Sequence, residues 1–547
     1  MPRSLQPGTK IVVIGGGVAG LASAALLADH GADVCVVDNG RRLGGRAGKL
    51  ELADYPGFRW DTGPSWFLMP DAFEHFYQLL GTSIDQELTM THLEPGYRLF
   101  PENDHPVDIP RGIEAVAQLA ESFESGAGQK MREYLTLAGE VYEIACQRFL
   151  YTTFSTPAPF LHPIVIRRLG LLLQLLGRSL ESWVNQNFND TRLRQMLKYP
   201  AVFLSGEPRS IPALYHLMSH TDLVQGVRYP QGGFAAVIDS LIRLCQQRGV
   251  TFRLRTSVQE ITWEASRSKN PLRKAHATGV NAEEQTPDGP RKIHLDADYV
   301  VSTVDLHHSE MDLLPAHLRT WNNKHFRRVN PGISAVLVMA GVTGSLPELE
   351  HHNLFFSHNW EVDFDQVRRP LQFRPGEDPV AHTPFSRSVY VSKTSATEHD
   401  VAPAGHENLF ILVPVVSDPR LGHGNLHHQE ASASVSYIQD QVIELISRRA
   451  NIPDLRSRIV IAKTLGPADF LEQHHSFHGG AIGPAHTLVQ SAFFRGAVRS
   501  SAVDNLFFAG ATTRPGVGVP MCLISAENVL KAMTGDRTSG PRKSREQ

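Results

Sequence analysis

The sequence of 547 residues contains only four cysteines, Cys35, Cys146, Cys245 and Cys522, and no two of them are close together. This spacing excludes the paired cysteines of zinc and thiol redox motifs, and it indicates reduced core thiols, as in cytosolic proteins. No uninterrupted run of about 18 apolar residues occurs, so no membrane-spanning helix is predicted. The first residues, MPRSLQPGTK, lack the order of a secretory signal. We therefore expect a cytoplasmic protein, with attachment to one face of a membrane left open.

The chain also lacks a large net charge and a recognisable metal motif. Lys and Arg number 53 and Asp and Glu number 56, so the formal net charge of −3 gives no electrostatic footprint for nucleic acid. Histidines cluster, but no HExxH or CxxC accompanies them. The clustered histidines are His351, His352, His474, His475 and His478. We predict neither a nucleic-acid partner nor a metal site.

Near its start the sequence carries the pattern of a dinucleotide-binding βαβ unit, KIVVIGGGVAGLASAALLADHGADVCVVDNG. Gly15, Gly17 and Gly20 fit GxGxxG: the first permits a tight turn, the second lets backbone approach a pyrophosphate, and the third lets helix and strand pack closely. Asp38 follows Gly20 by 18 positions, where a carboxylate can bind both hydroxyls of an adenosine ribose. A free ribose is implied, which disfavours NADP.

The loop RRLGGRAG, residues 41–48, follows Asp38 at once and indicates which dinucleotide is bound. Gly45 and Arg46 suit a second loop against the phosphates, an extension typical of flavoproteins with two dinucleotide-binding domains. This favours FAD over NAD. The alternative interpretation is a solvated basic turn without a ligand.

A second glycine-rich turn, AGATTRPGVGVP at residues 509–520, comes almost 500 residues after the first. FAD is long, so its isoalloxazine end needs another close approach of backbone, and Gly510, Gly516, Gly518 and Val519 are the candidates. The helix that follows would direct its positive N-terminus at the pyrimidine side of the ring, where negative charge develops on reduction. The alternative is a helix-entry loop without a ligand.

The rest of the chain separates into a mostly helical stretch, residues 71–225, and a stretch of alternating strand-like and helical runs, residues 306–475. We predict an α/β fold in which a Rossmann-like FAD-binding domain is interleaved with a mixed-sheet substrate domain and a helical region that contacts the membrane. The predicted ranges are 1–100, 226–305 and 476–547 for the discontinuous FAD-binding domain, 101–225 for the helical substrate and membrane region, and 306–475 for the substrate-binding domain.

Several sequence blocks occur in the order seen in FAD-containing carotenoid desaturases, among them YPQGGF, ADYVVSTVDLHHSE, GPADFLEQHHSFHGGAIG, LVQSAFFR and NLFFAGATTRPGVGVP. The chain resembles the bacterial and fungal type phytoene desaturases over nearly its whole length, while its first glycine turn is shared with many flavin amine oxidases. The resemblance implies that DTGPSW, residues 61–66, comes near the flavin and that the backbone of Val258 lies beside adenine. Two positions depart from the family's last motif: Arg514 stands where His is usual, and Met521 where Gly is frequent. The departures bear on the exact substrate.

The resemblance further implies an FAD-dependent oxidoreductase that converts phytoene through successive desaturations towards lycopene, by hydride transfer to flavin, with oxygen or a quinone as electron acceptor. Such a long apolar carotenoid needs an apolar channel, because it offers no polar handle. Arg514 is the catalytic candidate, in an orienting or charge-stabilising role, since arginine is a poor base. The alternatives are another carotenoid-modifying flavoenzyme (a C30 desaturase, isomerase or ketolase), an FAD amine oxidase, and a non-catalytic lipid binder similar to GDP-dissociation inhibitors.

The stretch LHPIVIRRLGLLLQLLGRSLESWV, residues 161–184, combines many Leu and Ile residues with Arg167, Arg168 and Arg178. It fits an interfacial helix whose apolar side enters the bilayer while the arginines meet lipid phosphates. A helix packed in the protein core gives much the same pattern. Because the substrate resides in the bilayer, peripheral association with a membrane surface is the favoured interpretation.

Overall fold

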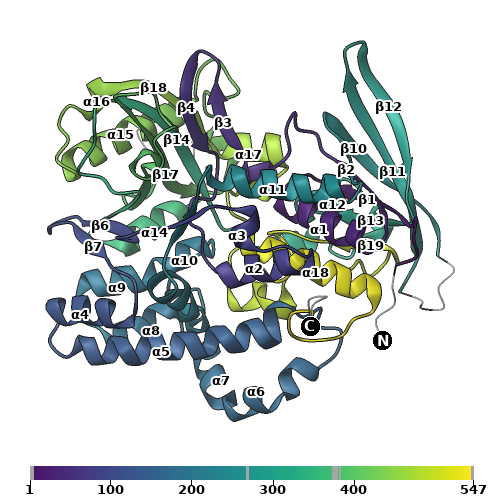
Figure 1. Ribbon diagram of the computed structural model, residues 1–547, viewed down its shortest axis with the longest axis horizontal. Coiled ribbons are helices and arrows are strands. Elements are labelled where there is room, and N and C mark those ends of the chain that lie inside the picture. Colours follow the sequence, from purple (N-terminus) through teal and green to yellow (C-terminus); the bar gives the residue numbers. More distant parts are fainter. Residues whose placement is uncertain (1–4, 267–269, 271, 373–379, 381–382, 544–547) are drawn as a thin grey trace.

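The computed structural model describes residues 5–266, 270, 272–372, 380 and 383–543. A parallel five-stranded sheet with the order β19-β13-β1-β2-β9 forms one part of the molecule (Figure 1). Its strands are β1 (Lys10–Ile14), β2 (Asp33–Val37), β9 (Thr251–Arg253), β13 (Tyr299–Ser302) and β19 (Leu506–Phe508). The apolar run that follows Lys10 in β1 is fully buried, as expected for a parallel strand covered on both faces.

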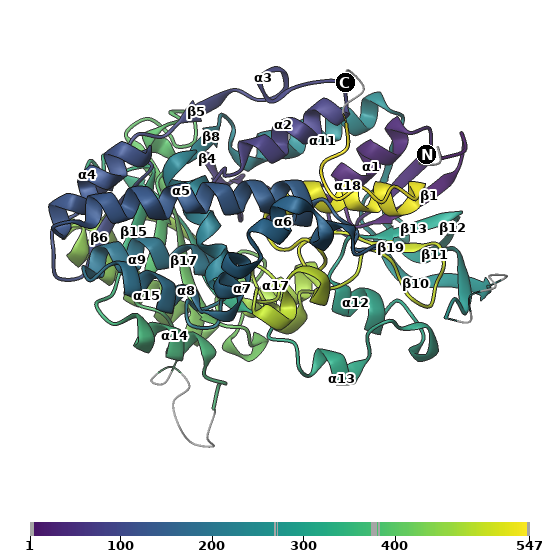
Figure 2. The same ribbon diagram turned by 90° about the horizontal axis from the view of Figure 1, so that it is seen from below.

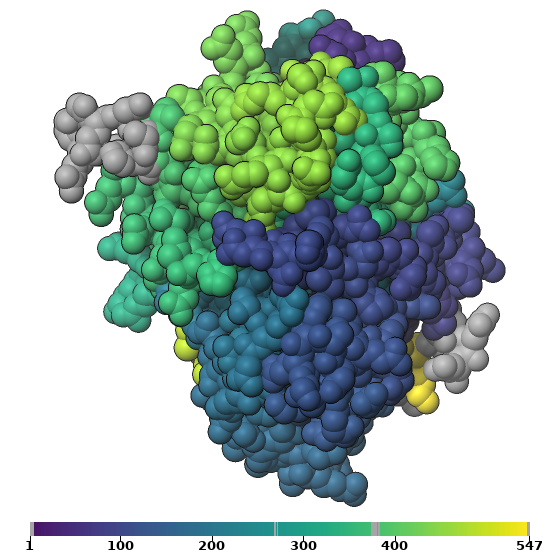
Figure 3. All heavy atoms as spheres, turned by 90° about the vertical axis from the view of Figure 1, so that its left-hand side faces the viewer, coloured from purple at the N-terminus to yellow at the C-terminus, as the bar shows by residue number. Residues whose placement is uncertain are grey.

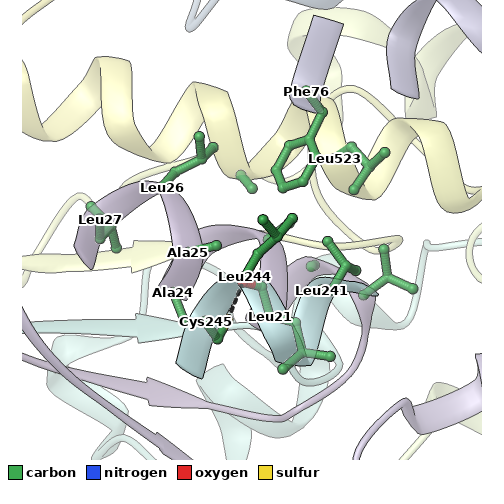
Figure 4. Packing of buried hydrophobic residues seen from close by; sticks show 14 of the residues in the cluster. Leu21, Ala24, Ala25, Leu26, Leu27, Phe76, Leu241, Leu244, Cys245 and Leu523 are labelled. Atoms are coloured by element: carbon green, nitrogen blue, oxygen red, sulfur yellow. Dashed lines mark hydrogen bonds between the residues drawn. The ribbon is translucent and has the colours of Figure 1, made fainter. Parts of the chain in front are cut away.

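Helix α1 (Val18–Asp29) packs between α11 (Gly233–Gln247) and α18 (Val519–Thr534). Its residues from Val18 to Leu27 are all buried, and the many alanines among them let the neighbouring helices come close. Figure 4 shows leucines of the three helices converging in this core, where the thiol of Cys245 donates a hydrogen bond of 3.3 Å to the carbonyl oxygen of Leu21. The C-terminal helix therefore completes the domain that the N-terminal βαβ unit begins.

The second large sheet has seven strands in the order β18-β14-β17-β16-β15-β6-β7. It is mixed, because β15 pairs with β6 in parallel while the other neighbours are antiparallel. Its strands are β6 (Tyr97–Pro101), β7 (Val107–Ile109), β14 (Ile333–Thr343), β15 (His352–Phe356), β16 (Val389–Ser392), β17 (His406–Val416) and β18 (Ile459–Leu465). Residues of α15 (Ala433–Arg449) share an apolar core with this sheet, and β14 is buried except at Thr343.

Smaller elements connect the two sheets. The remaining strands are β3 (Lys49–Leu52), β4 (Tyr55–Asp61), β5 (Met90–His92), β8 (Arg228–Pro230), β10 (Thr256–Ala265), β11 (Ala275–Thr286) and β12 (Gly289–Asp296). The helices beside them are α2 (Pro70–Leu79), α3 (Ile84–Glu87), α12 (Leu306–Met311), α13 (Asn323–Phe326), α14 (Trp360–Arg368), α16 (Leu455–Arg458) and α17 (Pro467–His474). The antiparallel sheet of β10, β11 and β12 projects beyond the five-stranded sheet (Figure 1).

A group of helices forms a lobe beside the seven-stranded sheet, with α5 along its length (Figure 2). In Figure 3 this lobe, in blue, lies directly against the green residues of the sheet region. Its helices are α4 (Ile113–Phe123), α5 (Ala127–Ala145), α6 (Pro163–Arg167), α7 (Leu169–Gly177), α8 (Leu180–Asn187), α9 (Thr191–Lys198) and α10 (Pro200–Phe203). None of the helices in the described part of the chain has the length and apolar character needed to cross a bilayer.

The stretch 161–184 does not form one helix but α6, α7 and the first turn of α8. Arg178 has an extended backbone, with φ −115° and ψ 153°, and ends α7 after Gly177. Ser179 then starts α8, because its hydroxyl accepts a hydrogen bond of 3.1 Å from the backbone N–H of Ser182. Gly177 and this N-cap break an apolar run that the sequence pattern treats as continuous. Two short helices with exposed apolar side chains result.

Candidate functional site

The two glycine-rich turns meet at the carboxyl edge of the five-stranded sheet. β1 ends just before Gly15 and β19 ends two residues before Gly510, and β13 lies between these strands. Thr303, directly after β13, donates its hydroxyl to the carbonyl oxygens of Ile14, at 2.9 Å, and Gly15, at 3.0 Å. A Cβ placed on Gly510 would lie 3.6 Å from the Cβ of Ala19 in α1. Ligands of open α/β sheets bind at this edge.

The three glycines of the first turn stand in different surroundings. Gly15 has a φ of +99°, which favours glycine in the tight turn. A Cβ on Gly20 would lie 1.9 Å from the carbonyl oxygen of Gly15, so the close packing of α1 on β1 requires glycine there. A Cβ on Gly17, at the N-cap of α1, would meet nothing closer than Gly44 and Gly45 at 3.9 Å. The space beside Gly17 is therefore open to a ligand at the helix N-terminus.

Asp38 lies directly after β2, beside the first glycine turn. One of its carboxylate oxygens accepts a hydrogen bond of 2.6 Å from the backbone N–H of Gly16, and the other accepts one of 2.7 Å from that of Gly40. These bonds fix the plane of the carboxylate. Each oxygen keeps a further lone pair, as the predicted contact with two ribose hydroxyls needs.

The loop 41–48 folds back over the first turn. The backbone N–H of Gly44 donates to the carbonyl oxygen of Gly16 at 2.9 Å, and Gly45 has a φ of +55°. The guanidinium of Arg46 donates to the carbonyl oxygens of Ala481, at 3.0 Å, and Ile482, at 3.2 Å. Arg46 therefore ties the first glycine turn to a loop from the last part of the chain.

Val258, in β10, lies in a buried apolar cluster with Ile14 and Val37, the last residues of β1 and β2. Its strand pairs with β11, and the register shifts between Val258 and Glu260. The structure thus brings Val258 to the side of the sheet edge where Asp38 stands. Its contact with adenine stays a prediction.

The second glycine turn leads directly into α18. The hydroxyl of Ser525 in α18 accepts a hydrogen bond of 3.0 Å from the backbone N–H of Gly510. Gly518, with a φ of +107°, is the N-cap residue, and the helix begins at Val519. A Cβ on Gly516 would lie 2.3 Å from Nε2 of His486, so a histidine ring occupies the space beside that glycine.

Arg514 points along the neighbouring loop. Its guanidinium donates to the carbonyl oxygens of Phe493 and, at 3.2 Å, Arg495, and it lies 5.4 Å from the ring centre of Phe154. Burial lowers its pKa to about 10, so it stays cationic at neutral pH. Arg514, for which we predicted an electrostatic role, is therefore held mainly by hydrogen bonds to backbone carbonyl oxygens.

Arg495 is a second buried cation, which the sequence analysis missed. Its side chain is 3% exposed, and it donates to the carbonyl oxygens of Ala511, Thr513, Pro484 and Gln490. No carboxylate is paired with it among the described residues, and burial lowers its pKa to about 10. Arg495 thus crosslinks the loop 484–490 to the second glycine turn. Its place within the LVQSAFFR block, close in sequence to that turn, was the available signal.

The segment DTGPSW brings an acid and an aromatic residue to the region between the two sheets. Asp61 accepts hydrogen bonds from the backbone N–H groups of Phe234, at 3.1 Å, and Ala235, at 3.4 Å, at the start of α11. Burial raises the pKa of Asp61 to about 7. The indole of Trp66 stacks on His352, with ring centres 5.0 Å apart.

The aromatic cluster around Trp66 continues into a small, largely apolar pocket. Tyr97, Tyr199, Phe203 and Tyr390 also contact the indole. The pocket is lined by Tyr199, Val202, Ile333, Phe356, Trp360, Asp363, Phe364, Val367, Ser386, Ser388, Val389, Tyr390, Leu412 and Pro414. Tyr199 and Tyr390 thus belong both to the cluster around Trp66 and to the pocket lining.

Asp222, near this cluster, gives a testable pH dependence. It is buried, accepts one long hydrogen bond of 3.4 Å from the hydroxyl of Tyr97, and has a pKa raised by burial to about 7. Between pH 4 and 7 the folded protein keeps a proton that the unfolded chain releases, so the free energy of unfolding falls as the pH rises. Between pH 5 and pH 8, we expect the free energy of unfolding to fall by about 2 kcal/mol less in Asp222→Asn than in the wild type.

Urea unfolding of the wild type and of Asp222→Asn at pH 5 and pH 8 checks this expectation. Burial also raises the pKa values of Asp61 and Glu310 to about 7, but both residues are present in both proteins. The two proteins should therefore differ in their loss of stability from pH 5 to pH 8 only through Asp222. An equal loss of stability from pH 5 to pH 8 in both proteins would contradict it.

Taken together, the residues at the sheet edge fit a flavin dinucleotide. The open space beside Gly17 lies at a helix N-terminus, where a pyrophosphate binds, and Asp38 has acceptor capacity for a ribose. Beside the second turn, both ring nitrogens of the buried His486 lack a hydrogen-bond partner among the described residues. The described residues contain no group of three or more His, Cys, Asp or Glu side chains that could hold a metal ion.

Comparisons with known proteins agree with this arrangement. Residues 18–361 match the model of the flavin-containing amine oxidoreductase family. The chain is 37% identical to a carotenoid 3,4-desaturase of Haloarcula japonica, covering 97% of this chain and 99% of the relative. It is 30% identical to a zeta-carotene-forming phytoene desaturase of Myxococcus xanthus, covering 97% and 95%. A putrescine oxidase variant of known structure, 15% identical, shares the fold with a TM-score of 0.57 and covers 97% and 99%. The chain is therefore an FAD-dependent oxidoreductase that belongs to the carotenoid desaturases of the flavin-containing amine oxidoreductase family.

Proposed function

We propose that the protein desaturates a long acyclic carotenoid, removing a hydride and a proton from neighbouring carbons so that a new C=C bond forms between them. The observation that carries the proposal is the similarity to carotenoid desaturases over 97% of the chain. When bound, flavin supplies the hydride acceptor. The protein's own residues would hold the substrate in line with that acceptor and exclude water.

Two substrates follow from the relatives. The higher identity, 37%, is to a carotenoid 3,4-desaturase, which favours a carotenoid that gains a double bond between carbons 3 and 4. The 30% identity to a phytoene desaturase favours phytoene, converted stepwise towards lycopene. We put the 3,4-desaturation first and keep the phytoene reaction as the second candidate.

The surroundings of Trp66 support an apolar substrate in either case. Its ring lies among other aromatic rings, including those of Tyr97 and Phe203. A hydrocarbon gains affinity in such a site from the removal of apolar surface from water.

The test is a product assay with both substrates. FAD-loaded protein is mixed with liposomes that contain either phytoene or lycopene, under air or, without oxygen, with a quinone, and the extracted pigment is analysed by absorption. New bands at longer wavelength from lycopene alone support 3,4-desaturation, and a series of bands from phytoene supports the second candidate. No conversion of either substrate with either acceptor, by protein that holds flavin, would overturn the proposal.

We also propose that the protein docks on a membrane surface through an apolar patch. The patch comprises the exposed side chains of Phe160, Leu161, Ile166, Leu169, Leu173, Leu488, Val489, Phe493 and Phe494. Its two segments meet where Phe160 and Phe493 make a ring contact with centres 6.0 Å apart. Helices α6 and α7, which carry part of it, lie at the lower edge of the molecule (Figure 1). Arg167, Arg168 and Arg178 are exposed in the same segment, and their positive charge favours anionic headgroups, although Arg168 also pairs with Glu140 at 2.8 Å.

The combined variant Leu161→Ser, Val489→Ser and Phe494→Ser should bind liposomes at least about 10-fold more weakly, because three apolar side chains no longer enter the bilayer. Flotation with liposomes that contain anionic phospholipid measures the change. Leu272→Ser is the matched control, since Leu272 is 67% exposed and Leu161 is 66% exposed. Equal flotation of the triple variant and the wild type would contradict the docking proposal.

A further inference from the structure

The loop before the second glycine turn contains a concentration of unsatisfied polar atoms. Nδ1 and Nε2 of His486 and Oγ1 of Thr487 are buried and have no hydrogen-bond partner among the residues that the structure describes. The side chain of His486 is only 3% exposed. Buried polar groups are almost always hydrogen-bonded, because leaving one unpaired is costly. Three such atoms in two consecutive residues leave hydrogen-bonding capacity for a bound molecule.

The ring of His486 lies against the second glycine turn. A Cβ on Gly516 would lie 2.3 Å from Nε2, so the absence of a side chain at Gly516 makes room for the imidazole. On another side the imidazole stacks on Tyr215, with ring centres 5.5 Å apart and planes inclined by 25°. The hydroxyl of Tyr215 donates to Ser491 at 3.0 Å and so does not satisfy the imidazole.

The loop that carries His486 is attached to both glycine turns. Near its start, Ala481 and Ile482 accept the hydrogen bonds of Arg46, which follows the first turn. A Cβ on Gly483 would lie 3.1 Å from Cγ1 of Val517 in the second turn. The loop therefore runs along the region where the two turns together would hold one long cofactor.

We propose that His486 is a positioning residue for FAD, whose imidazole hydrogen-bonds the polar pyrimidine edge of the isoalloxazine ring. A neutral imidazole offers one donor and one acceptor. The pyrimidine edge alternates carbonyl acceptors with an N–H donor, so the two sets are complementary. Burial and the cation of Arg495 hold the pKa of His486 well below its usual range, which keeps the ring neutral. Gly516 then serves the cofactor indirectly, by admitting the histidine.

The decisive variant is His486→Phe, which keeps a ring against Tyr215 and Gly516 but removes both nitrogens. It should leave the melting temperature of the flavin-free protein unchanged or raise it, because two unpaired polar atoms disappear. Its Kd for FAD should rise about 10-fold. Its flavin reduction potential should also shift, by about 30 mV if the affinities for oxidised and reduced flavin change by a relative factor of ten.

Two further variants separate positioning from packing. His486→Gln restores a donor and an acceptor and should recover most of the FAD affinity. His216→Leu is the control, because His216 is also a buried imidazole with an unpartnered Nε2, but it packs on Tyr134, with ring centres 5.4 Å apart. FAD titration and dye-equilibrated potentials should match the wild type in this control.

Several results would overturn the inference. They are a wild-type Kd and potential in His486→Phe, an equal loss in His486→Gln and His486→Phe, or the same loss in His216→Leu. If His486→Phe does not fold, the comparison of His486→Gln with His486→Leu takes its place. If His486→Gln and His486→Leu both kept the wild-type affinity for FAD, a contact between His486 and the cofactor would be rejected.

Discussion

Replacing Gly17 with leucine should lower the affinity for FAD by about 100-fold or more and leave the stability of the flavin-free protein nearly unchanged. The backbone of Gly17, with φ −77° and ψ −175°, suits any residue, and a Cβ there would meet no protein atom closer than 3.9 Å. The rest of a leucine side chain would extend into the space where the pyrophosphate approaches the N-terminus of α1. Flavin absorbance after reconstitution measures occupancy, and urea unfolding of the flavin-free protein measures stability.

Gly20→Leu is the contrasting variant on the same helix. Its Cβ would overlap the carbonyl oxygen of Gly15 at 1.9 Å, so we expect this variant to lose stability even without flavin. The pair separates a glycine needed by the ligand from a glycine needed by the fold. Normal FAD occupancy in Gly17→Leu would show that the cofactor does not approach this turn.

Arg495→Met should lower the free energy of unfolding by about 3–5 kcal/mol and reduce FAD occupancy. The substitution keeps an unbranched apolar stem but leaves four carbonyl oxygens without their donor, those of Ala511, Thr513, Pro484 and Gln490. Two of these carbonyls belong to the second glycine turn, so its conformation should loosen with the loss of the crosslink. Thermal and urea unfolding, with flavin absorbance, report both effects.

Arg499→Met is the matched control for that experiment. Arg499 is exposed and its guanidinium donates only to the carbonyl oxygen of Asp504 among the described hydrogen bonds. We expect a change within about 1 kcal/mol and normal flavin content. If Arg495→Met behaved like Arg499→Met, the backbone carbonyls around Arg495 would have found other partners, and its role as a crosslink would be wrong.

The fold class, the cofactor and the enzyme family could all be predicted from the sequence. The first glycine turn works through local geometry: strand, turn, helix and Asp38 follow one another within 30 residues, so their spacing is enough to indicate a dinucleotide site. The mixed sheet of the second part was predicted from its alternating runs. The roles of the individual cofactor residues and the domain boundaries stay predictions. One local feature was wrong: the stretch 161–184 is divided at Gly177 and Ser179, because an N-cap outweighs the continuity of an apolar run.

What the sequence by itself determined is therefore everything that short-range order encodes: the βαβ unit, the two glycine turns and the family. Only the tertiary structure decided which distant residues surround those turns. The chain returns to the five-stranded sheet as β19, and parallel pairing with β13 brings the second turn beside the first. Only this arrangement shows that His486 and Arg495 lie buried against the second turn. The burial of a polar side chain and the partners of its atoms depend on contacts between segments far apart in sequence. No local pattern contains them, because the same histidine or arginine in the same motif could equally face solvent.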